Sequence, residues 1–122
     1  MRITIPSKLR VGCIDYKIIW EDEIEGDRYL GFCDEVQGVI KLSPRIPNDD
    51  QRLLTFLHEV THAILYNVPF DHFLDRDIDP SDFNEYLTDR ISREALAIIK
   101  DNAHHEKTQN HTHTPRKTLS KA

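Results

Sequence analysis

Apolar and polar residues alternate through the first part of the chain, with the period of two that is typical of strands. Four segments show this alternation or the β-branched and aromatic residues that strands favour, namely residues 2–5, 16–20, 29–35 and 39–43. Gln37 and Gly38 fit a turn between the last two segments, and Pro44 and Pro47 end the run of strands. The pattern predicts a small sheet of three or four strands, antiparallel or mixed.

Two longer segments then show the helical period of 3.6 residues. Asn48, followed three residues later by Gln51, is typical of a helix N-cap with a variant capping box, and Pro69 must end that helix. We expect this helix over residues 49–67. Pro80 suits the first turn of a second helix, expected over residues 80–101. Strands followed by helices predict an α+β fold.

The chain has 122 residues, which suits one domain, here residues 1–101. Residues 102–122 are almost free of apolar side chains, and this composition predicts a disordered tail. The tail carries four basic residues against one acidic residue, a charge of +3; because the whole chain carries −5, residues 1–101 carry −8. An acidic domain argues against nucleic acid as a partner. No apolar run predicts a membrane span or a signal peptide, so we expect a cytoplasmic protein.

Candidate metal ligands stand on the first predicted helix, in the pattern His58-Glu59-Val60-Thr61-His62. Residues four apart lie one above the other on a helix, so both imidazoles can reach one zinc ion from the same side. Glu59 lies about 100° around the helix, where it can take a proton from a bound water. The main apolar stripe of the helix lies elsewhere, which argues against core histidines; two solvated surface histidines remain the alternative.

A catalytic zinc site needs a third protein ligand. The metzincin continuation would require glycine at position 65 and histidine at position 68, but Leu65 and Val68 stand there. The second helix offers Glu85 and Asp89, four residues apart on one face. That face continues with Ser92, Leu96 and Ile99, so we expect it to be covered, while the main apolar stripe lies on the other side. Glu85 and Asp89 are therefore both candidates for the third ligand.

The two motifs together, HEVTH and then NEYLTD, resemble the gluzincin signature of zinc metallopeptidases. A closer likeness, over most of residues 10–101, is to short phage and prophage proteins related to the ImmA/IrrE-type metallopeptidases. The resemblance implies a minimal zincin-like domain with Zn²⁺ bound by His58, His62 and Glu85. It also implies a hydrogen bond that Asp89 accepts from His58, and Glu59 as general base in peptide-bond hydrolysis. A phage-encoded protein would act in the host cytoplasm.

Two parts of such a site remain open at this stage. A peptide or protein substrate is expected to lie along an edge strand, which we assign to Val39, Ile40, Lys41 and Leu42. The larger gluzincins have a second lobe that supplies an oxyanion-stabilising side chain, for which the candidates here are Tyr66, His72 and Tyr86. The missing lobe also supports an alternative function, a catalytically silent, zinc-stabilised protein-binding module such as a phage accessory protein.

Overall fold

The computed structural model describes residues 4–24 and 29–112, with side chains up to Asn102. Its elements follow the predicted order of strands and then helices, so the α+β class is confirmed. They are β1 (Lys8–Val11), β2 (Ile14–Trp20), β3 (Gly31–Asp34), β4 (Val39–Leu42), α1 (Asp49–Leu65), the short 3₁₀ helix η1 (Phe70–His72) and α2 (Pro80–Thr112).

The four strands form one mixed sheet in the order β1-β2-β4-β3. β1 and β2 pair antiparallel, β2 and β4 pair parallel, and β3 and β4 pair antiparallel. The prediction that Val39–Leu42 is an edge strand is therefore wrong, because β4 has a hydrogen-bonded neighbour on each side. Ten residues separate the end of β2 from the start of β3, so β3 need not pair with β2. The position next to β2 is occupied by β4. Among the described strands, β1 and β3 lie at the two edges of the sheet.

The first strand also differs from the prediction. Residues 4 and 5 are not in a strand, residues 1–3 lie outside the described part of the chain, and the strand observed is Lys8–Val11. Gly12, with a φ of 63°, forms the tight turn that pairs Val11 with Ile14. Gly38, with a φ of 70°, forms the turn between β3 and β4, where a Cβ would lie 2.8 Å from the carbonyl oxygen of Asp15. The two turns set the register on both sides of the sheet.

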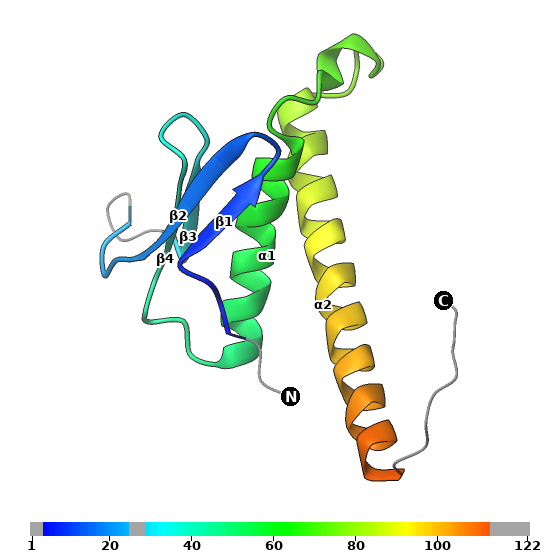
Figure 1. Ribbon diagram of the computed structural model, residues 1–122. Helices are drawn as coiled ribbons and strands as arrows, with labels where there is room; N and C mark the ends of the chain where they lie inside the picture. Colours follow the sequence, from blue (N-terminus) through cyan, green and yellow to red (C-terminus); the bar gives the residue numbers. More distant parts are fainter. Residues whose placement is uncertain (1–3, 25–28, 113–122) are drawn as a thin grey trace.

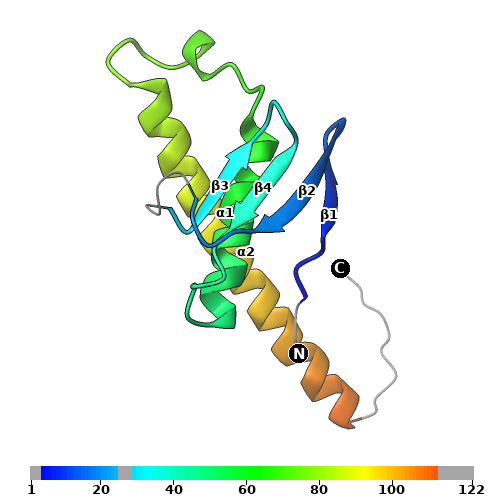
Figure 2. The ribbon, with the colours of Figure 1, turned by 90° about the vertical axis from the view of Figure 1, so that its left-hand side faces the viewer.

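The molecule has three layers, the sheet, α1 and α2, with α1 in the middle (Figure 1). Turned by 90°, the sheet lies in front of the two helices (Figure 2). The core lies between the sheet and α1 and consists of Tyr16, Ile18, Ile40, Leu42, Phe56 and Ala63. Among the described elements, α2 contacts only α1 and η1. Thus α1 is covered on two sides, and one of these sides faces α2.

The helix ends follow local signals in the sequence. The Asn48 side chain accepts a hydrogen bond from the backbone N–H of Gln51 at 2.8 Å, which confirms the predicted N-cap of α1. Asp79 accepts one from the N–H of Ser81 at 2.8 Å, at the start of α2. The predicted end of this helix at Asp101 is wrong, because α2 continues through Thr112. No proline or glycine interrupts the sequence there before Pro115. The predicted disorder of residues 113–122 lies outside the described residues.

α1 and α2 run antiparallel and approach closely through small side chains. Thr88 and Ser92 of α2 are 0% exposed, and the Ser92 hydroxyl donates to the carbonyl of Thr88 at 2.8 Å. The expected cover of this face is confirmed at Ser92, whereas Glu85, on the same face, is 64% exposed. At the far end of the pair, Lys100 Nζ lies 2.6 Å from Asp50 Oδ2. No helix in the described part of the chain has the length and apolar character needed to cross a membrane.

Candidate metal centre

His58 and His62 lie on the side of α1 that faces α2. The sheet takes the opposite side of this helix, with Phe56 and Ala63 in the core, so the two imidazoles are left at the boundary between the helices. Their ring centroids are 4.9 Å apart, and the side chains are 29% and 20% exposed. The histidines are therefore partly buried at the interface of the two helices, neither in the core nor fully solvated.

Glu85, near the start of α2, extends its carboxylate to both imidazoles. Its two oxygens lie 3.1 Å from Nε2 of His62 and 3.8 Å from Nε2 of His58. The three ligand atoms lie within 4.8 Å of one another. Zinc bonds of about 2.0–2.2 Å in tetrahedral geometry separate neighbouring ligand atoms by about 3.3–3.5 Å. Two nitrogens and one oxygen this close together could hold a metal ion after small side-chain movements, and the 64% exposure of Glu85 leaves one side of the cluster open to solvent.

The protonation of His58 suits a metal ligand. Burial, followed by the neighbouring His62, lowers the pKa of His58, while the charges of Glu85 and Asp89 act in the opposite direction. A histidine binds a metal ion in its neutral form, so the lowered pKa would allow His58 to act as a metal ligand at lower pH than an ordinary histidine.

Glu59 is buried beside the cluster, with only 7% of its surface exposed. Its carboxylate lies under the edge strand β3, where Oε2 would be 2.9 Å from a Cβ on Gly31. Burial first, and then the charges of Glu85 and Glu35, raise the pKa of Glu59 to about 8. A carboxyl group with a pKa near neutrality can both accept and return a proton, which is what a general base requires.

Asp89 lies near the cluster but is engaged elsewhere. Its carboxylate accepts hydrogen bonds from Nε of Arg93 at 3.2 and 3.1 Å. Among the hydrogen bonds of the described residues there is none between Asp89 and His58, so the bond that the resemblance implies is not made in this conformation. Because Asp89 and Arg93 are one helical turn apart on an exposed surface, their pair forms locally without help from α1.

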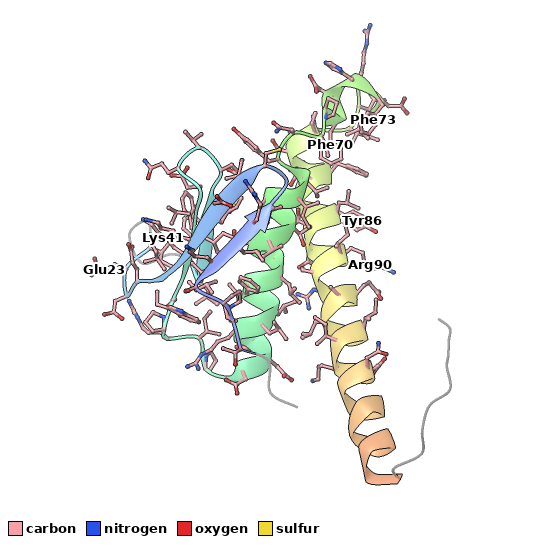
Figure 3. The ribbon with its side chains drawn as sticks, in the orientation of Figure 1. Glu23, Lys41, Phe70, Phe73, Tyr86 and Arg90 are labelled. Atoms are coloured by element: carbon pink, nitrogen blue, oxygen red, sulfur yellow. The ribbon has the colours of Figure 1, made fainter. Side chains whose placement is uncertain are left out.

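The three candidates for an oxyanion-stabilising side chain lie in different places. Tyr86 is 61% exposed and points away from α1 (Figure 3). His72 is exposed on η1, beyond the end of α1. Tyr66 follows His62 by one helical turn and is the C-cap residue of α1. Its side chain is 44% exposed.

Two features of the site were not predicted from the sequence. The first is the edge strand β3, whose Gly31 approaches Glu59; glycine inside a strand pattern is the signal that marks such a close approach. The second is a cavity of about 500 Å³ beside Glu85, lined by Val68, Phe70, Asp71, Pro80, Ser81, Asn84 and Glu85. No local sequence signal predicts this cavity, because the residues that line it come from two separate segments, 68–71 and 80–85.

Comparison with protein-family models, with curated proteins and with solved structures gives no match.

Proposed function

We propose that the protein is a zinc-dependent peptidase with a His-His-Glu metal site. The proposal is carried by one observation: the ligand atoms of His58, His62 and Glu85 cluster within 4.8 Å, and a buried carboxyl group stands on the adjacent residue, Glu59. Bound zinc would polarise the scissile carbonyl and lower the pKa of the attacking water. The resemblance to the gluzincins and to the ImmA/IrrE-type proteins points to the same chemistry.

In this proposal Glu59 moves the proton. It accepts a proton from the attacking water at its carboxylate and passes it to the amine of the departing chain. The raised pKa supports both steps, because a carboxylate with a pKa of about 8 is a stronger base than an exposed one. Tyr66 is the candidate that donates a hydrogen bond to the developing oxyanion, since it follows His62 by one helical turn and Tyr86 points away.

The substrate would lie along β3. The N–H of Ser43 donates to the carbonyl of Leu30 at 2.9 Å, and from there hydrogen-bonded residues alternate along β3. The alternation directs the N–H and C=O groups of Gly31 and Cys33 to the open edge. An extended peptide can pair with these groups, and Gly31 brings it next to Glu59 because no side chain intervenes.

The test is Glu59→Gln, measured by cleavage of a peptide library and by zinc content. We expect cleavage to fall by at least about a hundredfold while one zinc per chain is retained, since Gln cannot accept the proton. Glu94→Gln, a change at an exposed carboxylate paired with Arg90 on α2, is the matched control and should cleave as wild type does. Equal cleavage by Glu59→Gln and wild type would show that the mechanism is wrong.

A catalytically silent, zinc-stabilised protein-binding module is the second candidate. The outer face of α2 favours it, because Ile91 and Ile98 are 40% and 60% exposed and could contact a protein partner. Removal of the metal separates the two functions. A peptidase loses cleavage and keeps its fold, whereas the module unfolds and shows no cleavage even when zinc is restored.

A further inference from the structure

The cavity beside the metal cluster has walls of mixed chemistry. Val68, Phe70 and Pro80 provide apolar surface, and Phe70 is held in place by ring contacts with Phe73 and Phe83 at centroid distances of 5.7 and 5.5 Å. Figure 3 shows Phe70 and Phe73 together above the start of α2. Glu85 belongs both to the cavity wall and to the metal cluster, so whatever occupies the cavity lies directly beside the candidate reaction centre.

The cavity wall carries negative charge. Asp71 and Glu85 line it, and no lysine, arginine or histidine does. Glu85 is engaged with the two histidines, whereas in the described part of the chain no side chain pairs with the carboxylate of Asp71. The surrounding loop, residues 68–79, holds four aspartates against one arginine. A cationic group is therefore the ligand that this charge distribution favours.

An anionic occupant is disfavoured, although the cavity lies at the start of a helix. The N–H of Ser81, which would bind an anion there, already donates to Asp79 at 2.8 Å. Asn84, by contrast, suits a peptide. Its Oδ1 accepts from the hydroxyl of Thr88 at 3.2 Å, which leaves its amide N–H₂ group to donate to a peptide carbonyl.

We propose that this cavity is a specificity subsite that accepts a lysine or arginine side chain of a peptide, with Asp71 as the selecting charge. The aliphatic stem of the basic residue packs on Val68, Phe70 and Pro80, and its charged head meets Asp71 near the solvent. The proposal rests on the proposed peptidase function as far as cleavage is concerned. Binding of a basic peptide to the cavity does not depend on it.

The first measurement profiles the full-length, zinc-loaded protein against peptides randomised at one position at a time. We expect lysine and arginine to be favoured over norleucine by about fivefold at one fixed position from the scissile bond, as suits an ion pair near solvent. Asp71→Asn should remove the preference, and Asp71→Lys should shift it towards glutamate. Asp77→Asn, in the same loop but outside the cavity wall, is the matched control and should leave it unchanged.

The second measurement detects binding without cleavage, from the backbone amide signals of Val68, Ser81 and Asn84. The probes are blocked single residues, N-acetyl-lysine N-methylamide and its norleucine counterpart, and the lysine probe should bind more tightly by about fivefold. Equal binding of both probes, or lysine selectivity that survives Asp71→Asn, would overturn the subsite. Lysine-selective binding without cleavage of any peptide would support the subsite and contradict the peptidase. Cleavage that shows no preference for basic residues and is unaffected by Asp71→Lys would support the peptidase and contradict the subsite.

Discussion

Nε2 of His62 and Oε2 of Glu85 lie 3.1 Å apart across the interface of α1 and α2. The first residue comes from the middle layer of the molecule and the second from the outer layer, so the candidate metal centre exists only when the two helices are packed. The fully buried Thr88 and Ser92 permit that packing because larger side chains would hold the helices apart.

The first prediction concerns metal content. In full-length protein whose tail histidines are replaced by alanine, we expect one zinc per chain by elemental analysis. His62→Ala and Glu85→Ala should each weaken zinc binding by more than about a hundredfold. Removing a ligand lowers the metal affinity more than removing a side chain that only orients a ligand. Glu94→Ala is the control on the same helix. Unchanged zinc in Glu85→Ala would mean that the third ligand is another residue. The replaced tail residues are His104, His105, His111 and His113.

The second prediction concerns the metal-free protein and pH. The folded-state pKa of Glu59 is raised from 4.5 to about 8, so the unfolded state loses the proton first as pH rises. The folded state is therefore destabilised progressively between about pH 4.5 and 8 and by a constant amount above that range. Glu59→Gln should remove this penalty, and its free energy of unfolding should exceed that of wild type by several kcal/mol at pH 8.

Urea unfolding at a series of pH values, with chelator present, measures this effect. Below pH 4 the two proteins should differ little, because Glu59 is then protonated in both states. Glu94→Gln, at an exposed carboxylate paired with Arg90, is the control and should not show this pH dependence. A gain in stability that does not change with pH would argue that packing, and not charge, is responsible.

The third prediction concerns Gly31. A Cβ at this position would lie 2.7 Å from Cγ2 of Thr55 and 2.9 Å from Oε2 of Glu59, so Gly31→Ala must displace one of these side chains. We expect a loss of stability of about 1–2 kcal/mol and a larger loss of peptide cleavage. Thr55→Ser removes Cγ2 and keeps the hydroxyl that donates to the carbonyl of Gln51. In the double variant stability should recover more than activity, because the clash with Glu59 persists.

The fourth prediction separates the tyrosines. Tyr66→Phe should lower kcat by at least about tenfold with little change in KM or zinc content, since an oxyanion donor acts mainly in the transition state. Tyr86→Phe is matched in chemistry and should have no effect, because Tyr86 points away from α1. If Tyr66→Phe retains wild-type kcat, the oxyanion is stabilised by another group.

The helices, and with them the candidate ligands, could be predicted from the sequence because their signals are local. The Asn48 cap, the 3.6-residue period and the spacing of His58, His62 and Glu85 depend only on neighbouring residues and on two helices packing together. The sheet order could not be predicted in this way. Ile40 and Leu42 alternate with less buried residues as they would in an edge strand, and only the long-range parallel pairing with β2 makes β4 an inner strand.

The face of each helix was also only partly predictable. The face of α2 with Glu85 and Ser92 was expected to be covered, and it is covered at Ser92 but not at Glu85. The stripe with Ile91 and Ile98 is more apolar, yet these two side chains are 40% and 60% exposed. The face of α2 that packs on α1 is the one with the small residues Thr88 and Ser92. These residues let the two helices approach more closely than the bulkier apolar stripe would allow.

The position of the metal cluster along the antiparallel pair decides how the helices would come apart. The cluster lies at the end where residues 66–79 already join α1 to α2, whereas the opposite end is held by Lys100 and Asp50, an exposed ion pair. A bridge between His62 and Glu85 closes only a short loop, so it restricts the unfolded chain little. We therefore expect local opening to begin at the Lys100 end and to proceed towards the cluster, so that the candidate site is the last part of the interface to separate.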